Sequence, residues 1–479
     1  MASDNSQQAI FPLTVFDRLF ERSAFVTGWL VEGTIDVDAI AVALRRVTDK
    51  WRMLAGRLDS IVERDRTKWL LKIPLGIPDQ NYSSFALTST VSTTPITQYI
   101  PIPIPFSSPS LPHSLFIHPD TPRQYSAWKA RDYPLTCWHI THFPTLSETG
   151  KSYSCIGFAR CHGVFDGVAA AMIVNALISE LNGQAWHVPP LPSSGLNVNP
   201  LQEFLNRAVA DVDDLHQLRD ASGYVNVGLT GVLKVAGWHT FERWWRNAQR
   251  RIFIIPGPVI TQFLDRVRVD LPTESEDTNH ISTGDILVAW LMQTIYAQGT
   301  ADSTTVHCTN FASFRNVASV DERLAWYPHN AFVPLPYPVY TVKDLKIFPL
   351  HELAHQMSST RRMLSTKHVL GGYIAMLENP LSIPAHQTAQ EAFLLSNVSA
   401  SRILEANWAS AGGSPTLCGY RYSMTPTELI LTNSVYISGR LADSSIVLDT
   451  TLTENRRELL ESRIGQMIAL YNASKWLTP

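Results

Sequence analysis

The sequence predicts a mixed α/β (α+β) fold arranged in two domains. Segments with the alternation of strands and segments with helical spacing follow one another in both halves of the chain, a pattern typical of sheets covered by helices. At about 100–200 residues per domain, 479 residues suffice for two to four units. Prolines cluster after residue 188 and the alternation restarts after Pro256. We therefore expect an N-terminal domain at 1–190, a crossover linker at 191–260 and a C-terminal domain at 261–479.

The first half of the chain is expected to combine strands with two helices and one irregular segment. Asp36 is placed to cap a helix whose apolar residues fall on one face. Eight prolines between residues 94 and 124 predict an extended segment that wraps around the domain. The remaining predicted elements are strands at 25–31, 69–73, 135–143 and 152–161, a charged hairpin turn at 63–66 and a helix at 168–181.

The second half repeats the alternation after an unusual stretch at 224–251. That stretch is apolar at first and ends basic and aromatic. We interpret it as an interdomain helix that covers core, and the alternative is a helix lying on a membrane surface or a partner. Ser282 and Asp285 form a capping-box-like start of a helix. Further predicted elements are strands at 306–311, 392–396, 429–438 and 445–452, and helices at 350–363 and after Thr453.

Composition narrows the class of protein. A net charge of -3 argues against a nucleic-acid partner, which would require a basic excess. No run reaches the ~18 apolar residues of a membrane span, and the polar N-terminus lacks the features of a signal peptide. Five scattered cysteines without a C-x-x-C pair indicate reduced thiols. We expect a cytoplasmic protein without a membrane span.

The chemistry of the chain is expected to centre on His162, Asp166 and Gly167, an H-x-x-x-D-G pattern between a predicted strand and a predicted helix. A histidine at the end of a strand can project into a cleft, and its reference pKa of ~6.5 suits a general base. With such a base, the reaction rate should rise with pH through an apparent pKa near that value. The drier the cleft, the further this pKa is shifted. Asp166 is expected to brace the turn. The plain alternative is a strand-terminal histidine without chemistry.

Cys161 precedes that histidine but is not expected to act with it. Neighbouring residues on a strand point to opposite faces, whereas a nucleophile and its base must face one another. We therefore expect Cys161 to lie in the core. By the same alternation His139 and His142, three residues apart on one predicted strand, do not form a metal-binding pair.

A rival pattern, His351-Glu352-Leu353-Ala354-His355, reads as H-E-x-x-H on a predicted helix. Two histidines four residues apart share one helix face and can bind zinc, with the glutamate activating water. The third ligand would be a residue such as His368 or Glu378. We prefer the solvated face of an amphipathic helix, because short motifs of this kind often arise by chance. A third possibility is a non-catalytic protein that binds metabolites.

Taken in order, these segments resemble the BAHD-type acyltransferases, which share a superfamily with chloramphenicol acetyltransferase and the peptide-synthetase condensation domains. The resemblance runs along nearly the whole chain. It rests on Leu54-Ala55-Gly56-Arg57-Leu58, the H-x-x-x-D-G of 162–167, the helix at 282–291, Arg315, and Tyr327-Pro328-His329-Asn330. The second signature of the family, Asp-Phe-Gly-Trp-Gly, is replaced by residues 407–413, which read Asn-Trp-Ala-Ser-Ala-Gly-Gly. This departure suggests a divergent branch, such as the fungal secondary-metabolite transferases.

The resemblance implies two chloramphenicol-acetyltransferase-like domains with a channel between them. An acyl-CoA, with acetyl-CoA as the expected donor, would enter one side and a small-molecule acceptor the other. His162 would deprotonate a hydroxyl or amine of the acceptor, Ser396 would contact the oxyanion, and Asp166 would pair with Arg315 beside Gly167. The resemblance implies no metal, no permanently bound cofactor and a monomer. It leaves the CoA-binding residues unidentified.

Overall fold

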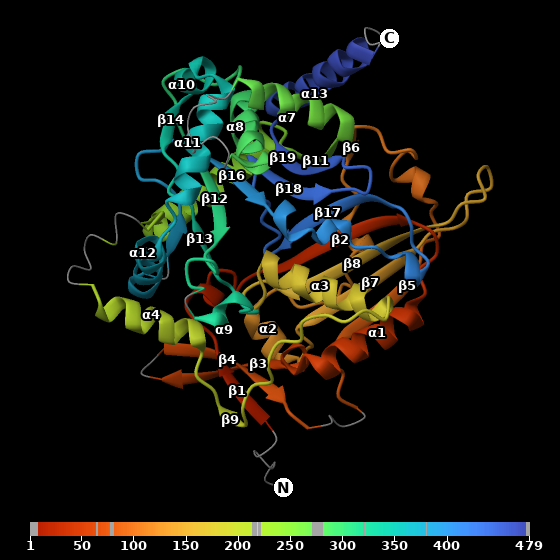
Figure 1. The fold of residues 1–479 in the computed structure, drawn as a ribbon, viewed down its shortest axis with the longest axis vertical. Helices are drawn as coiled ribbons and strands as arrows, with labels where there is room; N and C mark the ends of the chain where they lie inside the picture. Colours follow the sequence, from red (N-terminus) through yellow and green to blue (C-terminus); the bar gives the residue numbers. More distant parts are fainter. Residues whose placement is uncertain are drawn as a thin grey trace.

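The computed structural model describes residues 8–63, 66–76, 81–212, 218, 222–270, 281–319, 321–379 and 381–475. Sheets and helices are interleaved throughout these ranges (Figure 1), so the predicted mixed α/β class is confirmed. Within the described residues, the buried apolar side chains form two clusters, one built around the N-terminal sheet and one drawn from residues 253–464. No helix in these ranges combines the length and hydropathy needed to cross a bilayer.

The first cluster surrounds a sheet in which the order of the described strands is β17-β2-β8-β7-β5. The pairs β17–β2, β2–β8 and β8–β7 are antiparallel, whereas β5 runs parallel to β7. All nine residues of β8 are buried, which fits its central place. The strands are β2 (Ala24–Glu32), β5 (Ala86–Val91), β7 (Thr136–His142), β8 (Tyr153–Cys161) and β17 (Thr416–Met424), and the helices beside them are α1 (Val37–Lys50) and α3 (Gly167–Leu181).

The second cluster surrounds a larger sheet of order β13-β12-β16-β18-β19-β11-β6, to which β14 adds by pairing with β12. Five of the described helices, α7, α8, α10 (Val342–Ile347), α11 and α13, contribute apolar side chains to this cluster. Figure 1 shows these helices grouped at the top of the molecule. The strands are β6 (Ser107–Pro109), β11 (Gln249–Ile255), β12 (Thr305–Ser313), β13 (Phe332–Pro334), β14 (Val339–Thr341), β16 (Glu391–Asn397), β18 (Ser434–Arg440) and β19 (Ile446–Leu452). The helices are α7 (Gly257–Val269), α8 (Thr283–Ile295), α11 (Leu350–Arg362) and α13 (Glu454–Lys475).

Smaller elements complete the described fold. The predicted hairpin forms as β3 and β4, within a sheet of order β3-β4-β1-β9, and β10 pairs with β15. These strands are β1 (Gln8–Pro12), β3 (Arg57–Glu63), β4 (Arg66–Pro74), β9 (Gly195–Leu196), β10 (Tyr224–Asn226) and β15 (Ser382–Pro384). The remaining helices are α2 (Tyr125–Ala130), α4 (Pro200–Ala210), α6 (Gly228–Trp244), α9 (Glu322–Ala325) and α12 (Thr366–Glu378).

The two large sheets exchange strands. β17, from the C-terminal part of the chain, pairs along its length with β2 in the N-terminal sheet. β6, from the proline-rich segment, pairs with β11 in the other sheet. The domain limits drawn from the sequence stay a prediction, and the exchange means that each large sheet uses a strand from the other side of those limits.

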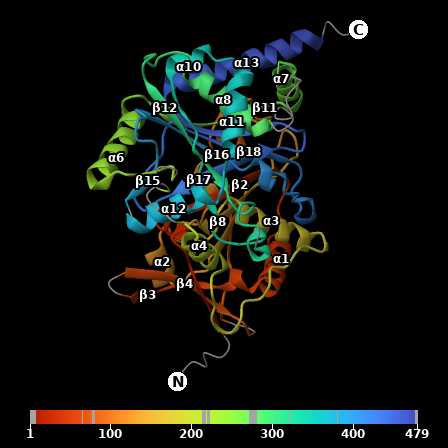
Figure 2. The same ribbon diagram turned by 60° about the vertical axis from the view of Figure 1, so that its left-hand side comes forward.

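Helix α6 differs from its predicted role. We expected a helix in 224–251 to cover core, but His239 and Glu242 are its buried residues. Leu229, Trp244 and the following Trp245 are between 67% and 76% exposed. Figure 2 shows α6 at the outer edge of the molecule. The prediction was wrong because an apolar sequence does not reveal whether another element packs on it.

The proline-rich segment behaves as predicted. Between residues 94 and 124 the structure has two single-turn 3-10 helices and the short strand β6. Phe116 from this segment lies across two glycines, Gly28 of β2 and Gly157 of β8, which face each other in register. A side chain at either position would collide with Phe116. The glycine pair therefore lets the segment lie directly on the sheet that carries His162.

We predict that Gly157→Ala lowers the free energy of unfolding by about 1–3 kcal/mol, the usual cost of overpacking a core. The added methyl would meet the backbone carbonyl of Phe116, which cannot rotate away. The matched control is Gly465→Ala in α13, where nothing lies within 4 Å of an added Cβ. There, alanine should stabilise the helix by roughly 0.5–1 kcal/mol. Chemical denaturation of both variants measures the difference, and equal stabilities would contradict the close approach.

Candidate active site

The turn that carries His162 is held from both ends. β8 ends at Cys161, and α3 begins at Gly167 with Asp166 as its N-cap, whose Oδ1 accepts from the Ala169 N–H at 2.9 Å. Asn330 Nδ2 donates to the carbonyl of His162 at 3.1 Å and to that of Gly163 at 2.6 Å. The strand-to-helix turn predicted from the sequence is therefore present.

The ring of His162 is packed between aromatic side chains. It stacks face to face on Phe20, with 4.1 Å between centroids and 1° between planes, and meets Phe25 at 5.1 Å and 66°. Its Nδ1 is buried and has no hydrogen-bond partner among the residues that the structure describes. Burial lowers the pKa of His162 to about 3, and the charge of Arg160 acts in the same direction. The ring is therefore neutral at physiological pH and can accept a proton.

Cys161 belongs to the apolar core around the N-terminal sheet. It is fully buried, and burial raises the pKa of its thiol. A buried, protonated thiol is a poor nucleophile. The predicted core position of Cys161 is confirmed.

Asp166 and Arg315 form the expected ion pair. Arg315 Nη1 donates to Asp166 Oδ2 at 2.8 Å and Nη2 to Oδ1 at 3.1 Å, and both side chains are buried. The backbone N–H of Ala331 also donates to Oδ2, at 3.2 Å. Burial acts to raise the pKa of Asp166, but the charge and hydrogen bonds of Arg315 outweigh it and hold this pKa below its ordinary value. A carboxylate with four donors suits support rather than proton transfer.

Arg315 is fixed on its other side by the backbone of the segment that follows it. Its Nε donates to the Tyr327 carbonyl at 3.0 Å, and its Nη2 to the His329 carbonyl at 2.6 Å. The Arg315 side chain is thus a bridge between the turn of His162 and the segment 327–331.

His162 opens into a cavity of about 670 Å³ that both large sheets line. Of the predicted site residues, His162, Asp166, Gly167 and Ser396 line it, while Arg315 lies behind Asp166. Ser396 is on β16, and its Oγ accepts from Arg421 Nη1 at 3.4 Å. Much of the remaining lining is aromatic or aliphatic: Phe20, Phe25, Leu287, Val288, Phe311, Phe332, Leu335, Tyr337, Leu394, Leu395 and Tyr436. Such a lining suits a largely apolar small molecule.

Reasoning from the sequence missed much of the lining, including four residues next to His162 or Ser396: Phe20, Phe25, Arg160 and Arg421. A signal for Arg160 was present, because it precedes His162 by two residues and alternation places it on the same side of the strand. No local signal marks the other three. Arg421 reaches the cavity only because β17 joins the N-terminal sheet.

The rival H-E-x-x-H pattern lies on α11, outside the lining of the cavity. Within the described ranges, no three His, Cys, Asp or Glu side chains are placed to hold a metal ion. The segment 407–413, which replaces the second family signature, also lies outside the cavity lining. Its Trp408 is buried against Trp29, 5.2 Å between centroids, so this segment has a structural place in the described fold.

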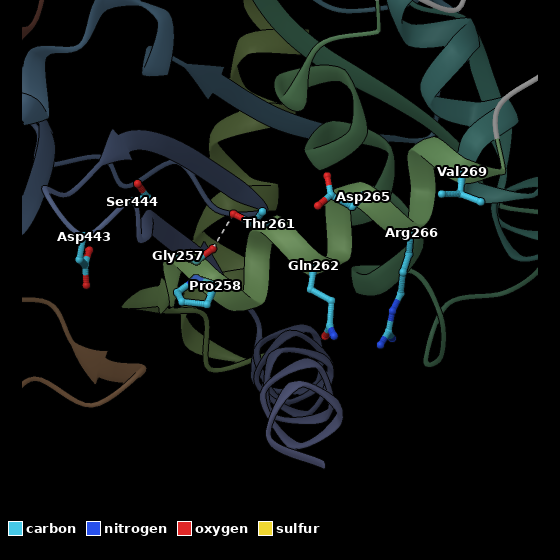
Figure 3. Close-up of a pocket in the computed structure, with 9 residues that line it drawn as sticks. All are labelled: Gly257, Pro258, Thr261, Gln262, Asp265, Arg266, Val269, Asp443 and Ser444. Carbon is cyan, nitrogen blue, oxygen red and sulfur yellow. Dashed lines mark hydrogen bonds between the residues drawn. The ribbon is translucent and has the colours of Figure 1, made fainter. Parts of the chain in front are cut away.

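A second hollow, of about 640 Å³, opens on the surface of α7. Figure 3 shows its residues, among which Thr261 donates from Oγ1 to the Gly257 carbonyl at 2.9 Å. It shares no lining residue with the cavity of His162 and contains no histidine or cysteine. The candidate catalytic residues predicted from the sequence therefore lie at the cavity of His162 and not at this hollow.

Comparison with known proteins identifies the fold. No protein-family model and no curated protein matches the sequence. F. graminearum TRI101, solved with coenzyme A and T-2 mycotoxin, superposes with a TM-score of 0.63 and 12% identity over 95% of this chain and 97% of that one. TRI3 trichothecene 15-O-acetyltransferase from Fusarium sporotrichioides gives 0.56 and 10%, over 97% and 95% of the two chains. Polyketide synthase associated protein 5 from Mycobacterium tuberculosis gives 0.57 and 12%, over 97% and 98%. At these identities the likeness shows a shared fold.

We predict that Asp166→Ala lowers the free energy of unfolding by roughly 3–5 kcal/mol, because it leaves the buried charge of Arg315 without its partner. The control is Glu63→Ala, which breaks the exposed pair with Lys68 and should cost at most about 1 kcal/mol. Urea unfolding of both variants compares the two costs. Equal small losses would show that the Asp166–Arg315 pair is incidental to the fold.

We also predict that His351 and His355 bind no metal. Elemental analysis of the purified protein should find less than stoichiometric zinc. Exposure to a chelator should leave the melting temperature unchanged. A zinc content near one per chain that disappears with His351→Ala would establish a metal site on α11 instead.

Proposed function

We propose that this protein transfers an acyl group from an acyl-CoA to a hydroxyl or amine of a small apolar molecule. The observation that carries the proposal is the neutral His162, at the end of β8, facing a cavity lined by both large sheets. The shared fold supports it, because relatives of that fold include a protein solved with coenzyme A and a mycotoxin, and a trichothecene 15-O-acetyltransferase.

The reaction begins with His162 as general base. As the acceptor oxygen or nitrogen attacks the thioester carbonyl, the new C–O or C–N bond forms and the acceptor proton passes to the imidazole. The low pKa of His162 means that this transfer accompanies attack, when the proton has become acidic, rather than preceding it. The carbonyl oxygen becomes an oxyanion. The C–S bond then breaks, the carbonyl re-forms, and the thiol of coenzyme A leaves with the proton returned by His162.

Ser396 is the proposed oxyanion donor. Its Oγ accepts from Arg421 at 3.4 Å, so its own proton is free to point elsewhere in the cavity. A single preorganised donor of this kind contributes about 10²–10³-fold to a rate. Asp166, Arg315 and Gly167 act as positioning residues, because they hold the turn and the start of α3 from behind the cavity.

We predict that His162→Ala reduces the rate of acyl transfer roughly 10²–10⁴-fold, the usual contribution of a positioned general base. The substrates are found by incubating the protein with acyl-CoAs, acetyl-CoA first, and a panel of terpenoid, polyketide and alkaloid alcohols and amines, with products detected by mass. The melting temperature should stay close to that of the wild type, because the ring lines a cavity. His351→Ala is the control and should retain activity. A His162→Ala protein within a few-fold of the wild type would contradict the mechanism.

A second prediction concerns pH. From the sequence alone, the rate would be expected to fall on the acidic side of the pH profile near ~6.5, the reference pKa of histidine. In the structure, burial and Arg160 lower the pKa of His162 to about 3. Protonation removes the base, so kcat/KM should stay level through neutral pH and fall only in strongly acidic buffer. Arg160→Met removes one neighbouring positive charge and should move this limb to higher pH. A wild-type limb near 6.5 would show that the cavity is wetter than its packing indicates.

A further inference from the structure

Two buried arginines face the cavity beside His162. Arg160 is on β8 and is 1% exposed, and Arg421 is on β17 and is 6% exposed. Both line the cavity. Within the described part of the chain, no carboxylate lies within ion-pairing distance of either guanidinium. The pair is therefore a concentration of positive charge inside an otherwise apolar cavity.

Strand pairing brings the two side chains to one face of the sheet. Arg160 lies opposite Phe25 of β2, and Arg421 lies opposite Thr27, two residues further along the same strand. Residues two apart on a strand share a face. Both guanidinium carbons consequently lie over the Phe25 ring, 5.0 Å and 4.9 Å from its centroid.

Only some of the N–H donors of these two guanidinium groups have hydrogen-bond partners within the described part of the protein. Arg160 donates through Nε to the Phe165 carbonyl at 3.1 Å and through Nη1 to Thr27 Oγ1 at 3.4 Å. Arg421 donates through Nη1 to Ser396 Oγ at 3.4 Å. A guanidinium has five N–H donors, so each retains donors for a ligand. Burial lowers the pKa of Arg160 to about 9 and that of Arg421 to about 10, and both remain charged at neutral pH.

The nearest carboxylates are already engaged. Asp166 is paired with the buried Arg315, and Asp449 with the partly buried Arg250, so these two arginines of the region have their counter-ions within the protein. Buried charges are normally paired, because an unpaired one is strongly destabilising. Arg160 and Arg421 are the exceptions, and an anion from outside would complete the arrangement.

We propose that one of the two reactants carries a carboxylate that binds between Arg160 and Arg421. This inference rests on the proposed acyl transfer and names the chemical class of its substrate. The carboxylate can belong to the acyl group, as in malonyl-CoA or succinyl-CoA, or to the acceptor, as in a hydroxy acid. The phosphates of coenzyme A do not fit the position, because the pantetheine arm separates them from the thioester, whereas Arg421 contacts Ser396 beside the reacting carbonyl.

The experiment compares charged and neutral members of each reactant class. One arm measures binding by calorimetry and turnover for malonyl-CoA and succinyl-CoA against acetyl-CoA. The other arm compares hydroxy acids with their methyl esters as acceptors. The preferred charged reactant should be favoured over its neutral counterpart roughly 10–100-fold, the contribution of charge-assisted hydrogen bonds. The arm in which the preference appears identifies which reactant carries the carboxylate.

The variants are Arg160→Met and Arg421→Met, which keep an unbranched apolar side chain and remove the charge. Each should abolish the preference for the charged reactant, chiefly through a higher KM for that reactant, while the KM of the neutral counterpart stays unchanged. The control is Arg440→Met, a half-buried arginine elsewhere in the cavity lining, which should leave the preference intact. Without reactants, the melting temperature of Arg421→Met should equal or exceed that of the wild type, because a buried unpaired charge is gone.

Three results would overturn the inference, and they differ from one another. If the wild type used charged and neutral reactants equally well, the inference that a reactant carries a carboxylate would be refuted. A loss of kcat in Arg421→Met with neutral reactants would assign Arg421 to the oxyanion instead. Failure of the wild type to bind any acyl-CoA or to acylate any acceptor would refute the proposed function together with the inference.

Discussion

The buried ion pair between Asp166 and Arg315 is the interaction on which the rest of the site depends. One carboxylate caps α3, neutralises Arg315 and accepts the N–H of Ala331, so it ties the end of β8 to residues from the second half of the chain. Asn330 reinforces this tie by holding the carbonyls of His162 and Gly163. The position of the histidine ring is consequently set by contacts between the two halves rather than by its own turn alone.

That ring works in an unusual electrostatic setting. Stacking on Phe20 restricts its rotation, and burial together with Arg160 keeps it neutral. The same burial that weakens the base also strengthens any hydrogen bond made to it, because water is excluded. Paired and unpaired arginines share this region: Arg315 and Arg250 hold the protein together, whereas Arg160 and Arg421 leave donors for a ligand. An arginine that already has a carboxylate partner within the protein thus has a structural role, whereas one without such a partner can bind a substrate.

Sequence reasoning succeeded where the determinants are local. The capping residues Asp36 and Ser282, the turn at His162 and the core position of Cys161 follow from neighbouring residues, and the structure has all of them. The partner of Asp166 and the cavity position of Ser396 came from the family resemblance and agree with the geometry. Arg421 could not be predicted, because it depends on β17 pairing with a strand far away in sequence. The exposure of α6 was also beyond reach, since no pattern within a helix specifies what packs on it.

The strand exchange has a consequence for how the chain is made. Until β17 has left the ribosome, β2 presents an open edge whose N–H and C=O groups can pair with another strand. Joining strands from opposite ends of the chain also closes a very large loop, which makes this step entropically costly and late in folding. A nascent chain of this protein therefore carries an aggregation-prone sheet edge through most of its synthesis. The sheet that carries His162 is among the first regions to be translated, and it must wait for residues 416–424 before its last strand is in place.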